Sequence, residues 1–556
     1  MRRLLPKPPL GIRQAIFLVL LCPALATCHD DLGLEEVVYQ CDTQRPCASG
    51  WLCAAGRCHE AGVLAVSVYG APAAAYPGLF PFGGCDHLRL CYTSGDDSTL
   101  QGCQDFPWTL NAADRAVDFP VPAGTEIRVT AQCMGGAATI ATGRSCPESF
   151  GPYGGVLQLY LLPRNSIGPT VDASGLVTGL QFPRLGATVT PLPDGRVLIA
   201  GGRASENGPP LDSAEYFDPR TGAFSEVGPG HRMQVPRVHA RAALLPDGTV
   251  AIFGGLAGDG KATAAVELFD PVDGEFAMAP PMALPRVFHT ATPLQNSGEV
   301  LIVGGVGEGA TSYENWTVDE GSESTRPLQE SRAHHTAIAV SSGAVQDSSS
   351  VVLIVGGEGD EFGSSAIRNT MEVYELAGNH SPEALPLCVL DNVAQSSPSA
   401  MTRHEAILVP DGRLCITLGG FADADSAEVS SGTCIWDTYV HAWAGDSAGY
   451  TMIQPRARFS AAIGFGVESS SIFISGGLGM GAGTASASSA ERLPLPGNAE
   501  EPTLLSPQPV PTPLLAPRWD HDAVTLCDGR VLIVGGLTGP SVDESTVTAI
   551  TEVYNP

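Results

Sequence analysis

The chain has 556 residues, which is too long for one ordinary hydrophobic core unless that core is built from repeats. Its 65 glycines and 45 prolines, in a sequence that is 44% hydrophobic, predict many short strands joined by tight turns and an all-β fold class. A formal charge of −29 repels phosphate backbones and anionic lipid, so we expect no nucleic-acid partner and membrane contact only through a lipid anchor.

Residues 1–27 have the pattern of a signal peptide. Basic residues precede an apolar run at 15–26, which is too short to span a bilayer. Residues 25–28, Leu-Ala-Thr-Cys, resemble the lipoprotein box of bacteria, although Thr27 departs from the usual Gly, Ala or Ser. We therefore expect lipid attachment at Cys28 and a place in the bacterial cell envelope as an outer-membrane lipoprotein. Simple secretion, with cleavage after Ala26 and Cys28 in a disulfide, is the alternative.

Residues 28–60 are predicted to form a tether and a small cysteine-rich module. Four closely spaced cysteines lie here, at Cys41, Cys47, Cys53 and Cys58. Small extracellular modules are stapled by two disulfides because so few residues cannot bury a core, and we expect the same here. A zinc site is the alternative, but the paired C-x2-C spacing of a zinc knuckle is missing.

Residues 61–166 are predicted to form a small disulfide-linked β domain. Strand-like alternation at 64–69, 125–130 and 156–161 suggests a β-sandwich. Five cysteines would cross-link this domain and leave one over: Cys85, Cys91, Cys103, Cys133 and Cys146. No catalytic grouping stands out, so we expect a spacer or binding module.

The remainder of the chain, residues 167–556, repeats one pattern seven times. Each copy has an apolar strand that ends in a glycine pair, and most copies continue into a third strand with Glu-x-aromatic and a short fourth strand. Asp-Gly turns open four of the second strands, which predicts tight hairpins between the first and second strands. The pairs, 50 to 63 residues apart, are Gly201-Gly202, Gly254-Gly255, Gly304-Gly305, Gly356-Gly357, Gly419-Gly420, Gly476-Gly477 and Gly535-Gly536.

Four strands per unit, the double glycine and the Glu-x-aromatic strand resemble the kelch repeat, whose family forms β-propellers. The resemblance implies a seven-bladed kelch-type β-propeller, which we number in blades along the chain. Since the sequence stops after the third strand of blade 7, we expect residues 175–180 to dock there as the missing outer strand.

Six first strands open with arginine, at Arg184, Arg237, Arg286, Arg332, Arg456 and Arg518. Because first strands line the channel of a propeller, these side chains are candidates for an anion-attracting ring. The alternative, which we favour, is that each arginine pairs with a third-strand glutamate. Blade 5 lacks both partners, with Met401 and Cys434 instead. Because the arginine and the glutamate are lost together in this blade, we expect the two residues to pair in the other blades.

Three residues after the arginine position, four blades carry a histidine, at His289, His335, His404 and His521. Histidines near one axis suggest copper or zinc, but kelch repeats commonly use histidine here for packing, so we expect no metal and no other cofactor. In blade 5, Cys415 and Cys434 lie on adjacent strands and are candidates for a disulfide in place of the lost ion pair.

The sequence contains no recognisable catalytic motif. We therefore expect a binding scaffold that presents its loops to a protein or glycan, more readily than an enzyme. The enzyme alternative is a propeller similar to sialic-acid mutarotases or to the copper radical oxidases. The latter need two Tyr, two His and a Tyr-Cys cross-link, and no corresponding set stands out.

Overall fold

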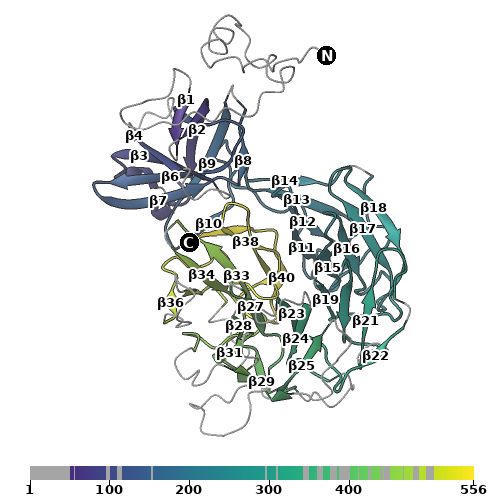
Figure 1. The fold of residues 1–556 in the computed structure, drawn as a ribbon. Helices are drawn as coiled ribbons and strands as arrows, with labels where there is room; N and C mark the ends of the chain where they lie inside the picture. The colour runs from purple at the N-terminus through teal and green to yellow at the C-terminus, as the bar shows by residue number, and fades with distance from the viewer. Residues whose placement is uncertain are drawn as a thin grey trace, which may run out of the picture.

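The computed structural model describes residues 51–556, apart from 55–56, 80, 95–100, 109–115, 152–153, 229, 295–296, 308–310, 323, 342–349, 360–366, 376–384, 387–400, 411, 413, 424–427, 439–441, 444–450, 468, 480–486 and 496–505. Two parts are visible in Figure 1: an N-terminal β domain in purple and blue, and a ring of sheets that runs from teal to yellow. No helix among the described residues is long and apolar enough to cross a membrane. The signal peptide, Cys28, Cys41 and Cys47 lie outside the described residues.

The ring is a β-propeller of seven four-stranded antiparallel blades, as the repeat predicted. Apolar alternation on each strand packs neighbouring blades face to face, so the core is distributed around the ring. The first three blades comprise β11 Thr188–Pro191, β12 Val197–Ala200, β13 Ala214–Asp218, β14 Ala223–Glu226; β15 Arg241–Leu244, β16 Val250–Phe253, β17 Val266–Asp270, β18 Glu275–Ala279; and β19 Thr290–Pro293, β20 Val300–Val303, β21 Ser312–Trp316, β22 Arg326–Pro327.

The remaining four blades follow the same order. Blade 5 adds a small hairpin of β29 Phe421–Asp423 and β30 Glu428–Val429, and blade 7 adds one of β39 Leu537–Thr538 and β40 Thr546–Val547. Their blade strands are β23 Thr336–Ser341, β24 Ser350–Val355, β25 Thr370–Glu375, β26 Leu385–Pro386; β27 Glu405–Leu408, β28 Leu414–Leu418, β31 Thr433–Asp437, β32 Ala442–Trp443; β33 Ser460–Phe465, β34 Ser470–Ser475, β35 Ala490–Pro494, β36 Gln508–Pro509; and β37 Asp522–Thr525, β38 Val531–Val534, β41 Glu552–Asn555.

The ring is closed by an N-terminal strand, but the predicted segment was wrong. The outer strand of blade 7 is β10 (Ser166–Pro169), which pairs antiparallel with β41. It follows the N-terminal domain after a two-residue turn in which Asn165 has a φ of 53°. Residues 175–180 instead run beside the segment before β41 and form isolated bridges, from Gly179 to Ile550 and from Val177 to Val171. Four residues that end in proline carry too little alternation to be recognised as a strand.

Neighbouring blades are joined by backbone hydrogen bonds from the glycine pairs. The first glycine of each pair has a φ of 57–70° and the second a φ of 84–103°, a left-handed backbone that disfavours any Cβ. This conformation aims the N–H of the second glycine at the carbonyl oxygen at the arginine position of the next blade, with N···O distances of 2.8–3.0 Å. All seven blades make this bond, and Gly536 closes the circle by donating to Arg184.

The propeller has two faces, which the chain order defines. The loop face carries the segments that enter each first strand and the loops between second and third strands. The hairpin face carries the turns between first and second strands and between third and fourth strands. The two faces therefore hold different sets of exposed residues.

The N-terminal domain is one connected sheet of nine strands with a single apolar core. The core draws side chains from β2, β5 and β9 as well as from β3 and β6, and the predicted β-sandwich stays a prediction. Strand β2 also crosses the predicted domain boundary at 60–61, and β1 pairs with it so that Cys53 lies opposite Cys58. The elements are β1 Trp51–Ala54, β2 Arg57–Gly70, η1 Pro77–Leu79, η2 Pro81–Gly84, β3 His87–Ser94, β4 Gln101–Pro107, β5 Ala116–Pro122, β6 Glu126–Gly135, β7 Ala138–Arg144, β8 Glu148–Ser149 and β9 Gly155–Pro163.

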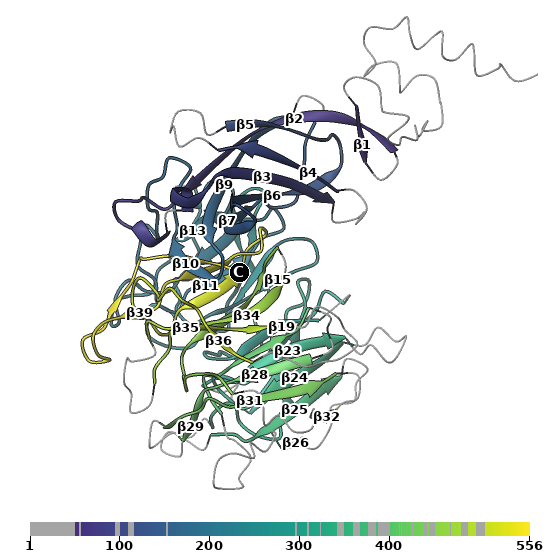
Figure 2. The same cartoon turned by 90° about the vertical axis from the view of Figure 1, so that its left-hand side faces the viewer.

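This domain lies next to β10, β11 and β13 in Figure 2, and its contacts reach turns on the hairpin face of the propeller. A disulfide joins Cys146 to Cys527 in the blade 7 hairpin. Arg144 donates to the carbonyl of Gly466 in blade 6 at 3.3 Å, and Arg220 of blade 1 pairs with Glu148. Three blades around the closure point, 6, 7 and 1, are therefore held by one domain.

The five cysteines of residues 61–166 form disulfides, and one of these bonds leaves the N-terminal domain. Disulfides join Cys85 to Cys133 and Cys91 to Cys103, and the cysteine left over in this domain, Cys146, is the one that reaches the propeller.

The predicted disulfide between Cys415 and Cys434 is wrong. Cys415 is a buried free thiol, whereas Cys434 is disulfide-bonded. The strand register explains this difference, because Cys434 lies opposite Thr417 and Cys415 lies opposite Trp436.

Candidate functional site

The six first-strand arginines lie buried against third-strand glutamates of their own blades. Their side chains are 0–1% exposed, and each pair approaches within 2.5–2.9 Å. In blade 3, Arg286 also donates to the carbonyls of Gly304 at 2.8 Å and Ser312 at 2.9 Å, while Glu314 accepts the backbone N–H of Ala283. The pairs are Arg184–Glu215, Arg237–Glu267, Arg286–Glu314, Arg332–Glu372, Arg456–Glu491 and Arg518–Glu552.

This burial rules out the anion-attracting ring that the same arginines suggested. A guanidinium that is buried and ion-paired inside a blade cannot turn into the channel without leaving a buried carboxylate unpaired. In blade 5, Met401 and Cys434 occupy the two positions and pack together in an apolar cluster. The arginine and glutamate therefore act as one structural unit within a blade.

The four histidines fill the contacts between blades. His289, for example, is fully buried, with its Cε1 facing the first glycine of blade 2 and its Cβ facing the second glycine of blade 3. His335, His404 and His521 are 3–5% exposed and repeat this placement. Phe459 takes the same position in blade 6, where its ring faces Gly419. Because phenylalanine substitutes for histidine there, the position selects a flat ring that fills a gap.

Desolvation lowers the pKa of each of these histidines, to about 3 for His404, so they are neutral at physiological pH. The Nε2 atoms of His335 and His404 lie 2.9 Å from the hydroxyls of Thr290 and Thr336. The histidines point into different blade contacts. Within the described part of the chain, no three His, Cys, Asp or Glu side chains gather as metal ligands would.

A ring that sequence reasoning missed lies one residue before the histidine position. Its members have a φ of 50–65°. Backbone hydrogen bonds link five of the seven successive pairs, such as His239 N–H to Gly186 O at 2.8 Å and Asp520 N–H to Arg458 O at 2.9 Å. We call it the axial ring, and its residues are Gly186, His239, Phe288, His334, Arg403, Arg458 and Asp520. It lies where the chain enters each first strand, on the loop face. Gly186 is the sequence signal that marks its left-handed backbone.

The axial ring has an aromatic half and a charged half. The ring of Phe288 lies 4.8 Å from His239 and 4.1 Å from His334, measured between centroids. On the other side, the Nε of Arg458 donates to Asp520 at 2.7 Å in a bidentate pair. All side chains of the ring are part-buried, so they remain within reach of a ligand.

Glu358, in the loop that follows the blade 4 glycine pair, joins the two halves. Its carboxylate lies 3.6 Å from Arg403 and 3.5 Å from His334. Arg403 is 35% exposed and Glu358 is 22% exposed, so solvent screens this ion pair only in part. Both groups can form further hydrogen bonds at the channel mouth.

Deeper in the channel, first strands bring Arg241, Glu405 and Asp522 to the axis at equivalent positions of blades 2, 5 and 7. Burial raises the pKa of Glu405 to about 8, with a further rise from the charge of Asp522 and a decrease from Arg241. Burial also raises the pKa of Asp522 to about 6. At neutral pH the pair therefore holds about one proton, and Arg241 balances the remaining negative charge.

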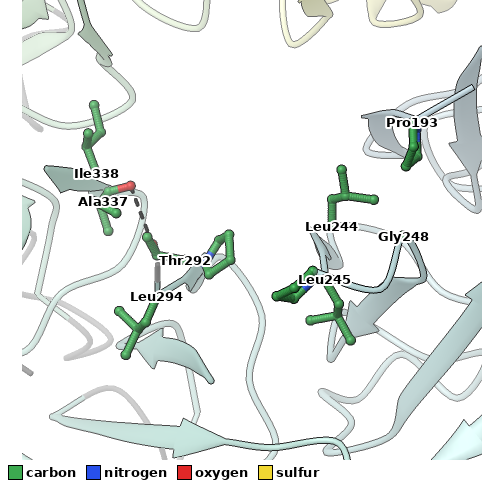
Figure 3. Close-up of a pocket in the computed structure, with 11 residues that line it drawn as sticks. Pro193, Leu244, Leu245, Gly248, Thr292, Leu294, Ala337 and Ile338 are labelled. Atoms are coloured by element: carbon green, nitrogen blue, oxygen red, sulfur yellow. Dashed lines mark hydrogen bonds between the residues drawn. The ribbon is translucent and has the colours of Figure 1, made fainter. Parts of the chain in front are cut away.

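A hollow of about 670 Å³ lies at the other end of the first strands, on the hairpin face. Its lining comes from blades 1 to 4 and is almost entirely apolar, with Leu244, Leu294 and Ile338 among its residues (Figure 3). The hydroxyl of Thr292 is already engaged with the carbonyl of Ala337 at 3.5 Å. The hydrogen-bonding groups near the axis thus lie toward the loop face, whereas the apolar lining of this hollow lies toward the hairpin face.

Comparisons with known proteins agree with the repeat. A family model described as the Kelch motif matches residues 187–230. No curated protein matches the chain. Two solved structures among the matches are a novel fungal alcohol oxidase of the AA5 family in complex with copper, and YjhT. The first is 15% identical, with a TM-score of 0.48, and the match covers 70% of this chain and 76% of that one. The second is 15% identical, with a TM-score of 0.40, and covers 59% and 99%.

Removing one partner of a buried pair tests the structural role of the arginines. We expect Arg286→Met to destabilise the protein by about 3–5 kcal/mol, because it leaves Glu314 buried and unpaired. The double variant Arg286→Met/Glu314→Leu, which imitates the apolar pair of blade 5, should be more stable than Arg286→Met alone. Urea unfolding midpoints measure both. Additive losses in the double variant would contradict a paired role.

The channel carboxylates predict a specific pH dependence of stability. A carboxyl group with a raised folded pKa favours folding in its neutral form, so its contribution is complete below its ordinary pKa and is lost as the pH rises through the folded value. Glu405→Gln should therefore melt close to wild type near pH 4.5 and above it at pH 8 to 9. A melting-temperature difference that stays constant over this range would show that Glu405 is not desolvated.

Proposed function

Because the chain is a kelch-repeat β-propeller whose buried arginine, glutamate and histidine side chains hold the blades together, we propose that it acts through its loop face as a binding protein. In this proposal it is an exported scaffold for a protein or glycan, tethered by lipid at Cys28 to the bacterial cell envelope. The disulfides among the described residues are typical of an oxidising, exported environment.

The observation that carries the proposal is the contrast between the two faces. On the hairpin face, blades 6, 7 and 1 are covered by the N-terminal domain. The loop face collects the axial ring, Glu358 and the extra hairpins of blades 5 and 7. Rigid scaffolds that carry variable loops around a polar centre are suited to ligand binding.

The position of the N-terminal domain supports a tether. The chain enters the described structure through this domain, on the hairpin face. An anchor upstream of it would leave the opposite face, which bears the axial ring, directed away from the membrane. Attachment and ligand binding would then occupy opposite sides of the disc.

One observation favours an enzyme as the second candidate. Glu405 and Asp522 have raised pKa values of about 8 and 6 within one channel, and two carboxyls held in different protonation states are suited to general acid and base steps. Activity against a bound ligand that disappears in both Glu405→Gln and Asp522→Asn, with binding retained, would establish this alternative.

The binding face can be tested by the direction of attachment. Lys261, exposed on the loop face in blade 2, is the one lysine that follows the predicted leader, so amine coupling should fix the exported protein by this face. In the matched variant Lys261→Arg/Val272→Lys, the lysine lies on the hairpin face, at a position where Val272 is 89% exposed.

We expect protein coupled through Lys261 to lose signal on combined glycan and peptide arrays, and the matched variant to retain it. The chain's N-terminal amine is common to both proteins, so the difference reports the lysine. The opposite order of signals would place the ligand on the hairpin face and contradict the proposal.

A further inference from the structure

The axial ring keeps side chains where its backbone favours glycine. Its seven members share one left-handed conformation, and blade 1 meets this requirement with Gly186. The other six blades carry residues with a Cβ at φ values of 50–57°, among them a phenylalanine and two arginines. A left-handed backbone is unfavourable for such residues, and strain of this kind persists where the side chain serves a purpose. The structural requirement alone would be met by glycine in every blade.

The chemistry of these side chains is divided between apolar and polar groups. His239, Phe288 and His334 form an arc of three ring systems across blades 2 to 4, with centroid distances of 4.8 and 4.1 Å. Burial lowers the pKa of His239 to about 4 and that of His334 well below its ordinary value, so both imidazoles are uncharged. The arc is therefore an uncharged aromatic surface at the channel mouth, with the phenyl ring of Phe288 as its apolar centre.

The polar half supplies donors and acceptors from two ion pairs, and Arg203 and Glu206 beside the ring add one further charge of each sign, so that the charges match. Arg403 and Arg458 are balanced by Glu358 and Asp520, with N···O distances of 3.6 Å for the first pair and a bidentate contact for the second. Deeper in the channel, Arg241 balances the one charge shared by the two carboxylates there. A charged ligand would upset this balance in a partly desolvated site, whereas a neutral ligand with several hydroxyls would not.

Resting on the binding function proposed above, we propose that the axial ring binds a neutral saccharide. A pyranose has one apolar C–H face and a circle of hydroxyls, which match the aromatic arc and the guanidinium and carboxylate groups opposite it. Phe288, at the centre of the arc, supplies the apolar contact, and Arg403, Glu358 and Asp520 supply hydrogen bonds. At blade 1 the ring contributes no side chain, and the imidazole of His239 packs over Gly186, where an added Cβ would lie 2.5 Å from its Nδ1.

Replacing the strained phenylalanine by glycine separates binding from stability. The probes are neutral methyl pyranosides, compared with a uronic acid and an amino sugar, in titrations of the exported protein. Phe288→Gly should weaken binding of the neutral sugar by at least about tenfold, through loss of the aromatic contact, while its melting temperature stays the same or rises. Asp520→Asn should weaken binding of the same sugar and should not alter the aromatic arc.

The matched control is Asn165→Gly. Asn165 also has a left-handed φ, of 53°, but it lies in the turn between the two domains and outside the axial ring. It should leave the affinity within about twofold. Unchanged sugar affinity in folded Phe288→Gly, or tighter binding of the charged sugars, would overturn the inference. If no sugar binds, but a peptide binds only when the loop face is left free by coupling, the saccharide inference fails and the proposed binding function stands. If a sugar binds only when the hairpin face is left free, both the saccharide inference and the proposed binding face fail.

Discussion

The structure depends on one backbone hydrogen bond that is repeated seven times. The N–H of the second glycine in each pair donates to the carbonyl at the arginine position of the next blade. This bond needs a left-handed backbone at both glycines and leaves no room for a Cβ at the first, which at Gly201 would lie 2.7 Å from the carbonyl oxygen of Arg237. Since the donor and acceptor are both backbone groups, the bond survives in blade 4, whose acceptor is Met401. Side chains are then free to differ between blades.

Two layers of polar residues follow from this arrangement. The arginine–glutamate pairs lie inside the blades, where they tie each entering loop to the third strand, and the histidines fill the gaps between blades. The axial ring lies one residue away, on the same turns, and its side chains reach the channel mouth. Adjacent residues can therefore have different roles: Phe288 belongs to the axial ring, whereas His289 fills a gap between blades. On each turn, the residue proposed to bind ligand directly precedes the residue that packs between blades.

The sequence predicted the blades because their signals are local and repeated. Double glycines, Asp-Gly turns and Glu-x-aromatic strands each reflect one backbone requirement that recurs seven times. Pairing of Arg with Glu could also be inferred, because blade 5 lost both at once. The closing strand Ser166–Pro169 was missed because it has four residues and its partner, β41, lies near the other end of the chain. The disulfide between Cys146 and Cys527 was missed for the same reason, since nothing local links residues 381 apart.

The candidate site was harder to predict than the fold. Arginine and histidine attract attention as chemical groups, and their repetition suggested a shared site, whereas repetition here marks structure. The axial ring varies from blade to blade, as Gly, His, Phe, His, Arg, Arg and Asp, so it carries no repeated signal. Its common feature is a backbone angle, which becomes visible only when the turns are placed in space.

The most direct test of this account is native-state hydrogen exchange at the second glycine of each blade. If the seven bonds form one closed circle, the amides of Gly202 and Gly536 should exchange only through global unfolding, at the same free energy as those in the middle blades. Faster exchange confined to Gly536, with the other six protected, would show that the ring opens between blades 7 and 1. That result would contradict a propeller whose closure depends on the same bond at every blade.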